Sequence, residues 1–214
     1  GYHFDQYDFV SDTHNTADWR NGRKGTINTS ARGETQTHAF YVQDKWQIDP
    51  HWALTLGGRV EHWQASHGEN KTTISNVLNT AQYQNVSETK FSPKASLSFE
   101  PTPAWGFRAA FGQAFRFPTV TELYQPLQNG ATPYFVQSNP NLQPEEVLAA
   151  ELTAERRFEN GLLRASFFTE NKYDALISQT LANGSTIPYD TGTCTRALGC
   201  SFVQNVDHIR TRGL

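Results

Sequence analysis

The sequence FSPKASLSFEPTPAWGFRAAFG, residues 91–112, determines the fold class of this chain. Its first half places apolar side chains such as Leu97 and Phe99 at odd positions, with lysine or serine between them. Its second half repeats this alternation around Phe107. The two halves are joined by residues 101–104, whose two prolines favour a tight reversal of the chain. Alternation with a period of two on both sides of a short turn predicts an antiparallel β-hairpin.

The same period of two recurs along the rest of the chain. Clear alternation predicts further strands at residues 52–61, 150–155 and 163–168; less regular strands are expected at 35–48 and 202–214, with a partial strand near 1–7. We therefore expect an all-β chain of about eight antiparallel strands.

The connections between these strands are alternately very short and very long. Turns of a few residues are expected at 49–51, 101–104 and 159–161, whereas the segments 66–88, 118–144 and 178–201 are long and rich in Asn, Thr, Gly, Pro and Gln. Loops of such length are uncommon in compact soluble domains. Short turns at one end of a sheet and long polar loops at the other are typical of outer-membrane β-barrels, where the turns are periplasmic and the loops extracellular.

Composition and strand length fit the same interpretation. Charged residues make up 18% of the chain, against about 25% in an average soluble domain. A strand of about 13 residues, tilted by about 40°, rises about 33 Å and can cross a hydrocarbon core of about 30 Å. Trp46, Trp52 and Trp105 all lie close to the expected short turns, as an aromatic belt at one membrane interface requires. The sequence thus predicts a segment of a transmembrane barrel wall.

A soluble or surface-anchored β-sandwich that binds glycans is the alternative fold and function. Its strands would also alternate, but the apolar side chains would fill a dry core between two sheets. Trp63 and the loop tyrosines would then serve as stacking platforms for sugars. The two folds differ in what contacts five apolar side chains, which is lipid in a barrel wall and a dry core in a sandwich. These side chains are Leu54, Leu97, Phe107, Leu152 and Phe167.

Several stretches resemble one known family, the TonB-dependent outer-membrane receptors. They are YVQD at 41–44, LTLGGR at 54–59, FSPK at 91–94 and RTRGL at 210–214. The most specific stretch, FRFPTVTELY at 115–124, is similar to the family's Phe-Arg-Ala-Pro box, with Phe117 in place of alanine. The stretch NPNLQPE at 139–145 resembles the box that follows it, and Glu151 falls where the next family strand carries a glutamate. The resemblance begins near Thr35; residues 1–34 do not align.

The resemblance implies a barrel of 22 strands with an N-terminal plug domain, energised through TonB. Residues 1–214 would form part of the barrel domain, because neither a plug nor a TonB box is visible in them. The implied function is active import of a scarce nutrient, most simply an iron-siderophore complex, across the bacterial outer membrane. The expected partners are TonB, acting through a plug outside this chain, a metal chelate or other small molecule, and outer-membrane lipid. In haem-transporting relatives a histidine is expected between the two boxes, and residues 119–138 contain none.

Charged residues on the polar face are candidates for ligand binding: Arg59, Glu61, Lys94, Glu100, Arg108, Glu151, Glu155, Arg164 and Glu170. They could instead pair across strands and set the register. Arg116 is the best single candidate, because it lies at the outer end of a strand next to a long loop; its alternative role is to donate to loop carbonyls. Tyr124, Tyr134 and Phe135 could stack on a planar ligand or pack the loop onto itself.

Cys194 and Cys200 are the two cysteines of the chain, and their close spacing suits a local disulfide formed in an oxidising compartment, with free thiols as the alternative. No resident cofactor is expected. The seven histidines lack the spacing of a metal site, so none is predicted. The net charge of -3, with no lysine and arginine cluster, argues against a nucleic-acid partner. No catalytic motif is present, and we do not expect an enzyme.

Overall fold

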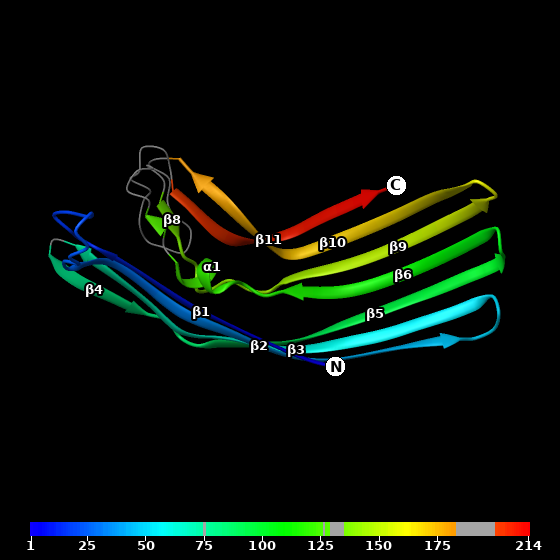
Figure 1. Cartoon of the computed structure of the whole chain (residues 1–214), viewed down its shortest axis with the longest axis horizontal. Coiled ribbons are helices and arrows are strands. Elements are labelled where there is room, and N and C mark those ends of the chain that lie inside the picture. Colours follow the sequence, from blue (N-terminus) through cyan, green and yellow to red (C-terminus); the bar gives the residue numbers. More distant parts are fainter. Residues whose placement is uncertain (75, 126, 129–134, 183–199) are drawn as a thin grey trace.

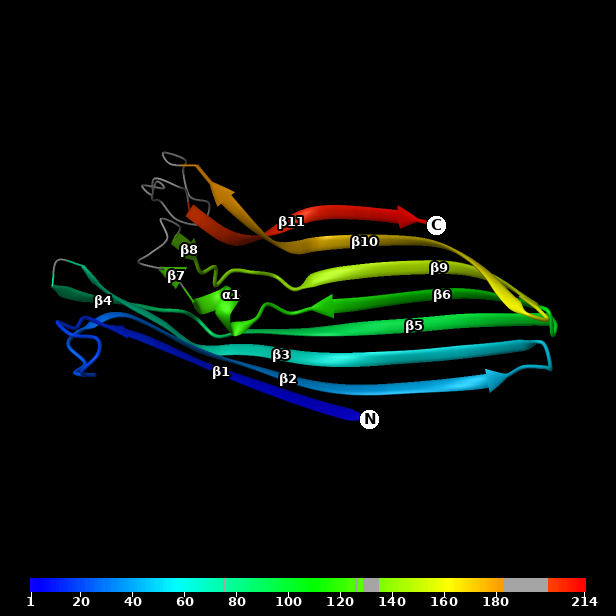
Figure 2. The same cartoon turned by 45° about the horizontal axis from the view of Figure 1, so that its top comes forward.

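The computed structural model describes residues 1–74, 76–125, 127–128, 135–182 and 200–214. Eight long strands form one curved layer, with the N- and C-terminal ends at opposite edges (Figures 1 and 2). They are β1 (Tyr2–His14), β2 (Ile27–Gln47), β3 (Trp52–Ile74), β5 (Val86–Thr102), β6 (Trp105–Arg116), β9 (Glu145–Phe158), β10 (Gly161–Leu181) and β11 (Cys200–Gly213). The chain is therefore all-β, as the alternation predicts, and the number of long strands also matches.

Four shorter elements complete the described structure. They are β4 (Val77–Gln82), helix α1 (Val120–Tyr124), β7 (Leu127–Gln128) and β8 (Phe135–Gln137). Neighbouring long strands are antiparallel in the order β1-β2-β3-β5-β6-β9-β10-β11, and β8 adds to β11 in parallel. Among the described strands, β1 at one end of the sheet and β7 at the other do not pair with each other, so the sheet is open.

The hairpin predicted from residues 91–112 is confirmed by the register of β5 and β6. Leu97 lies opposite Ala109, and Phe99 lies opposite Phe107. Because partners in an antiparallel ladder project to the same side, these apolar residues share one face. Lys94 and Ser96 project from the opposite face.

The expectation of a long loop at residues 66–88 was wrong. Strand β3 continues to Ile74 and forms a hairpin with β4, while β5 begins at Val86. Residues 1–34, where only a partial strand near 1–7 was expected, also lie mostly in strands, since β1 pairs with β2 as far as His14. Both hairpins lie on the side of the sheet away from the short turns (Figure 1). Strands with water on both faces do not need alternating side chains, which explains why the pattern did not reveal them.

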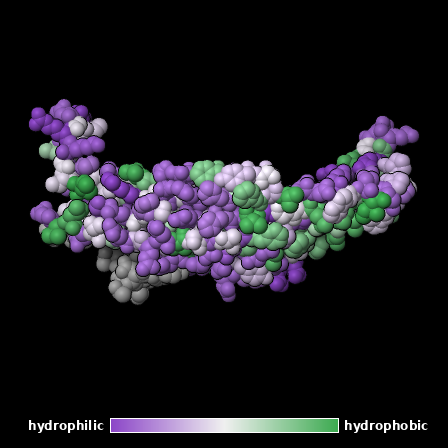
Figure 3. All heavy atoms as spheres, turned by 90° about the horizontal axis from the view of Figure 1, so that it is seen from below, coloured by the Kyte–Doolittle hydropathy of each residue, from purple (hydrophilic) through white to green (hydrophobic). Residues whose placement is uncertain are grey.

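One face of this single layer is apolar and exposed. Leu97 is 37% exposed, Phe107 40%, Leu152 61% and Phe167 50%, so these side chains do not fill a sealed interior. Seen from one side, apolar residues gather toward the end with the short turns, whereas the other half is mostly polar (Figure 3). A single layer with an exposed apolar face contradicts the β-sandwich alternative and fits a barrel wall. No described helix is long and apolar enough to cross a membrane.

The polar face carries a local distortion at the outer end of the sheet. Arg32 pairs with Glu69 and Glu34 with Ser66, so Gly33 alone lies opposite His67 and Gly68. His67 has a φ of 56°, in the left-handed region. This β-bulge brings two glycines side by side on neighbouring strands and leaves a flat patch without side chains.

Candidate functional site

The segment after β6 folds onto the polar face of the sheet, where α1 contacts β1, β2 and β3. The sequence Thr119-Val-Thr-Glu122 starts the helix with a capping box. The backbone N–H of Glu122 donates to the Thr119 hydroxyl over 3.3 Å, and the Thr119 N–H donates to the Glu122 carboxylate over 2.8 Å. The motif of threonine followed three residues later by glutamate was readable in the sequence, but this helix start was not among the predicted features.

Tyr124 fixes this helix to the sheet. Its side chain is 1% exposed and lies over the glycine patch of the bulge, so that a Cβ atom on either Gly33 or Gly68 would come within 3.0 Å of its ring. The ring also stacks on Tyr83, with 5.7 Å between centroids. Burial and the neighbouring Tyr83 raise the pKa of the Tyr124 hydroxyl. Of its two possible roles, the structure thus places Tyr124 in the packing role.

A small hydrophobic cluster surrounds this contact; its buried members are Trp63, Ala65, Val120, Leu123, Tyr124 and Leu142. Trp63 is 2% exposed and stacks on Phe117, with 5.5 Å between centroids. Trp63 is therefore not available as the exposed sugar platform that the sandwich alternative requires. The cluster holds the first box, and Leu142 of the second box, against the sheet.

Arg116 pairs with a carboxylate rather than with the loop carbonyls proposed as its alternative partners. Its Nη2 lies 2.6 Å from Oε1 of Glu122, and the Arg116 side chain is 45% exposed. Burial raises the pKa of Glu122, but the Thr119 backbone N–H, the Arg116 guanidinium and the Thr119 hydroxyl lower it more, so the net pKa lies below the usual 4.5. Arg116 thereby supports the helix start and keeps part of its guanidinium open to a ligand.

The second box is tied both to the first box and to the far strands. The Asn139 backbone N–H donates to the Glu122 carbonyl over 3.1 Å, and its side-chain amide donates to the Val203 carbonyl over 3.1 Å. Glu145, 8% exposed, lies 3.3 Å from Nζ of Lys172 and accepts a 3.0 Å hydrogen bond from the Leu176 N–H. The connection between β6 and β9 is thus anchored at both ends.

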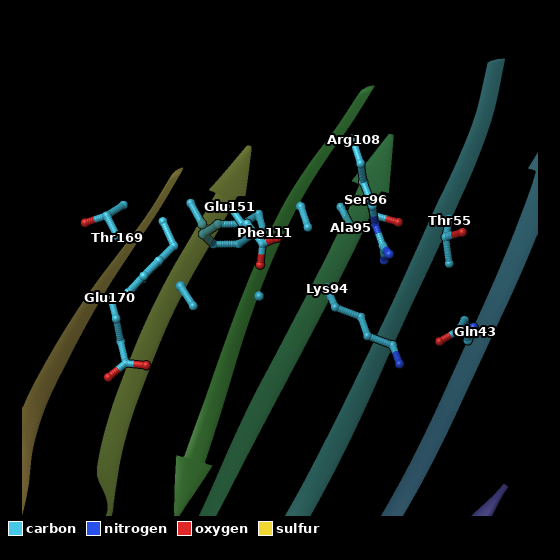
Figure 4. Close-up of a pocket in the computed structure, with 15 residues that line it drawn as sticks. Gln43, Thr55, Lys94, Ala95, Ser96, Arg108, Phe111, Glu151, Thr169 and Glu170 are labelled. Carbon is cyan, nitrogen blue, oxygen red and sulfur yellow. The ribbon is translucent and has the colours of Figure 1, made fainter. Parts of the chain in front are cut away.

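Toward the short turns, the polar face forms a recess of about 580 Å³. Its charged lining residues are Lys94 from β5, Arg108 from β6, Glu151 from β9 and Glu170 from β10, and small polar and apolar side chains lie between them (Figure 4). Neither Lys94 nor Arg108 forms an ion pair with any residue that the structure describes. Glu151 and Glu170 balance the formal charge of the recess, but Lys94 and Arg108 have no ion-pair partner in the described ranges and can each donate hydrogen bonds to an anionic or oxygen-rich ligand.

The other charges on this face mostly form ion pairs, and several pairs lie within one strand instead of across two. Arg59 lies 2.8 Å from Glu61, two residues along β3, and its guanidinium is 5.9 Å from the Tyr41 ring. Arg164 and Glu155, 2.6 Å apart, form a cross-strand pair of the predicted kind. Residues two apart on a strand share a face, which permits both arrangements.

The predicted ligand residues are only partly brought together. Arg116 and Tyr124 belong to the same docked segment, whereas Arg59 lies on β3. Tyr134 and the side chain of Phe135 lie outside the described residues. Cys194 is outside them as well, so the disulfide with Cys200 stays a prediction. Within the described ranges, no group of three His, Cys, Asp or Glu residues is arranged to hold a metal ion.

Comparison with known proteins decides the family. The model of the family described as "TonB dependent receptor-like, beta-barrel" matches residues 1–214. The chain belongs to this family. Barrels of TonB-dependent receptors lie in the outer membrane of Gram-negative bacteria, and the family comprises transport receptors rather than enzymes. The exposed apolar face of the sheet is accordingly the lipid-facing side of a barrel wall, and the polar face with α1 is the interior side.

Solved structures of TonB-dependent receptors share the fold at low sequence identity. The hemophore receptor HasR of Serratia marcescens, in complex with its hemophore HasA and heme, is 13% identical with a TM-score of 0.65; the match covers 99% of this chain and 38% of HasR. The copper transporter OprC is 13% identical with a TM-score of 0.59, covering 86% and 26%. The ferric-catecholate import receptor Fiu of E. coli K12 is 15% identical with a TM-score of 0.53, covering 88% and 26%.

These similarities show the fold alone. The chain spans less than two fifths of the length of each of these three structures. None of the curated protein sequences compared with the chain matches it.

Proposed function

We propose that the protein containing this chain is an outer-membrane receptor that imports a scarce nutrient, namely an iron-siderophore complex, with energy supplied through TonB. The observation that supports the proposal is the connection between β6 and β9. It docks α1 onto the interior face of the wall, so it lies in the path of a solute that enters from the long-loop end. An inward-folded segment beside a polar wall can contact such a solute before it passes.

In this proposal the ligand is captured by the loops and the polar wall. Arg116 and Arg59 donate hydrogen bonds to ligand oxygens, while Tyr134 and Phe135 stack on its planar groups. Tyr124 acts differently: it holds the segment in place against the glycine patch. TonB then acts on a plug carried outside this chain, and the ligand crosses the barrel.

Two features favour an iron-siderophore complex over other cargo. Siderophores bind iron through oxygen atoms and often carry negative charge, and Lys94 and Arg108 face the interior without carboxylate partners among the described residues. Residues 119–138 contain no histidine that could ligate haem. Among the structures that share the fold, Fiu is a ferric-catecholate import receptor, and its cargo belongs to the same class. Haem and copper remain the alternatives, because HasR and OprC also share the fold.

Growth and uptake on defined iron sources test the proposal. The gene for the full protein is deleted, and uptake of labelled iron is measured with ferric catecholate, hydroxamate and citrate complexes, beside haem and copper controls. We expect selective loss of uptake of one siderophore class. Unchanged uptake of every chelate, or loss confined to haem or copper, would refute the siderophore assignment.

Point variants locate the ligand contacts in the restored strain. The double variant Lys94→Ala/Arg108→Ala should raise the chelate concentration needed for half-maximal uptake by at least about tenfold, because the loss of even one charge-assisted hydrogen bond costs about 1.5–3 kcal/mol. Arg212→Ala is the matched control, since it removes a positive charge from the opposite face of the sheet. Equal effects of the double variant and the control would argue against a cationic interior site.

A further inference from the structure

A row of stacked aromatic rings crosses the lipid-facing side near the short turns. Trp52 stacks on Phe99 with 4.2 Å between centroids, and Phe99 lies 6.3 Å from Phe107. Phe107 in turn lies 5.8 Å from Trp105, with nearly parallel rings. The row therefore runs across β3, β5 and β6 at the level of the periplasmic interface, where aromatic rings of barrels are enriched.

Arg156 of β9 stands at the end of this row. It pairs with Trp105 on β6 and with Leu163 on β10, and these partners place its side chain on the lipid-facing side. Its Cζ lies over the Trp105 ring at 5.1 Å and over the Phe158 ring at 4.9 Å. The aromatic rings thus hold the guanidinium at the membrane surface.

The charge of Arg156 has no carboxylate partner among the described residues. Its neighbour Arg157 points to the interior side and has two, with Nη2 at 3.6 Å from Glu155 and 3.8 Å from Glu100. The two adjacent arginines therefore differ in whether a carboxylate of the protein neutralises them. The interior one is neutralised by protein, and the lipid-facing one lacks an anion from the described part of the chain.

We propose that Arg156, with Trp105 and Phe158, binds the phosphate of an anionic phospholipid in the periplasmic leaflet of the outer membrane. A guanidinium donates two parallel hydrogen bonds to phosphate oxygens, a geometry that a lysine does not reproduce. Cation–π contacts use none of the guanidinium N–H groups as hydrogen-bond donors to an oxygen, so these groups can donate to the phosphate. Phe107, 40% exposed, lies opposite Ala154, two residues further from the short turn than Arg156, and so continues the surface toward the membrane centre, where the acyl chains of the same lipid lie.

The full-length receptor in detergent, titrated with phosphatidylglycerol and followed by native mass spectrometry, tests this site. The wild type should retain phosphatidylglycerol adducts in preference to phosphatidylcholine. Arg156→Ala should weaken phosphatidylglycerol binding on the order of tenfold, as expected for loss of a charge-assisted hydrogen-bonded pair. Arg156→Lys should bind with intermediate affinity, and Arg212→Ala, which removes a charge from the same face on β11, should bind like the wild type.

Competition with phosphate and quenching by brominated lipids distinguish a lipid site from a simple anion site. Inorganic phosphate at millimolar concentration should not displace phosphatidylglycerol, because it lacks acyl chains. In lipid nanodiscs, brominated phosphatidylglycerol should quench tryptophan fluorescence more than brominated phosphatidylcholine in the wild type, and this preference should vanish in Arg156→Ala. Equal binding of the two lipids by the wild type, full displacement by phosphate, or unchanged binding in Arg156→Ala would each overturn the proposal. Nutrient uptake does not enter these readouts, so the test is independent of the proposed import function.

Discussion

Adding one methyl group at Gly68 should loosen the docked helix α1 without unfolding the sheet. A Cβ atom there would meet three atoms of the Tyr124 ring at less than 3.0 Å, a distance that real Cβ contacts do not show. The ring has no open side to move into, because it is 1% exposed and also lies against Gly33 and Tyr83. Gly68→Ala is therefore an overpacking substitution at the interface between the segment and the wall.

The strain from overpacking and the cost of exposing the Tyr124 ring decide whether α1 shifts slightly or leaves the sheet. Overpacking of this kind costs about 1–3 kcal/mol. Removing the Tyr124 ring from its site would expose about 150–250 Å² and cost about 4–6 kcal/mol at about 25 cal/mol per Å². Since the strain is smaller than the cost of release, we expect α1 to stay docked but to be less stable by about 1–3 kcal/mol.

Hydrogen exchange in the full-length receptor measures this loss directly. The N–H groups of Leu123 and Gln125 donate to the carbonyls of Thr119 and Thr121 over 3.1 and 3.0 Å, so they report on the docked helix. A loss of about 1–3 kcal/mol should lower their protection about 5- to 150-fold.

The matched control is Gly112→Ala, on the same face of the sheet, where an added Cβ would meet nothing within 4 Å. The second substitution Tyr124→Leu, made in Gly68→Ala, should restore part of the protection, because the smaller side chain leaves room for the methyl group. Unchanged protection in Gly68→Ala, or an equal fall in Gly112→Ala, would show that the glycine patch does not seat the ring.

Three further predictions test the charges and the two faces. Because hydrogen bonds lower the folded-state pKa of Glu122, its stabilisation of α1 is complete above about pH 4.5 and is lost as the pH falls through that lower pKa. After correction for intrinsic exchange, the protection of the Leu123 N–H should fall on acidification in the wild type but not in Glu122→Gln. Equal pH profiles of the two proteins would contradict this. Leu152→Arg should lower the free energy of unfolding in lipid bilayers, measured by denaturant titration, by about 2–4 kcal/mol. Thr153→Arg, on the interior side, should have a much smaller effect. Equal losses in the two variants would contradict the assignment of the faces. Arg59→Ala removes a partly exposed ion pair and should change the free energy of unfolding by less than about 1 kcal/mol while impairing uptake; a large loss of stability would show that Arg59 is structural.

The lipid-facing band was predictable from the sequence because the two faces of the sheet contact different solvents. Hydrocarbon on one side and water on the other force Leu97, Phe107 and their neighbours to alternate with polar residues. That constraint ends where the strands leave the membrane. Thr72 and Asn79 pair in the hairpin of β3 and β4 with water on both sides, so their sequence looks like a loop. The missed strands are therefore those on which the membrane exerts no selection for alternation.

The candidate site was less predictable, because its decisive contacts join distant parts of the chain. Gly33 and Gly68 lie on different strands, and neither local sequence indicates that a tyrosine ring will cover it. Resemblance to the family marked the segment that carries Arg116 and Tyr124, but it did not distinguish ligand contact from packing. The start of α1 was different, since Thr119 and Glu122 form a short-range capping motif whose geometry follows from spacing.

The docked segment and the sheet are stabilised by different interactions, and this separates their responses to mutation. The long strands are held by backbone hydrogen bonds between neighbours, and their apolar face is covered by lipid. Within the described residues, Trp63, Leu123 and Tyr124 belong to a hydrophobic cluster of the water-excluded kind found in soluble cores. Substitutions in this cluster should therefore weaken docking by a few kcal/mol and leave the strand ladder intact. A segment that can be released from the interior wall without unfolding the barrel is suited to respond to a ligand, because ligand contacts worth a few kcal/mol are enough to shift such an equilibrium.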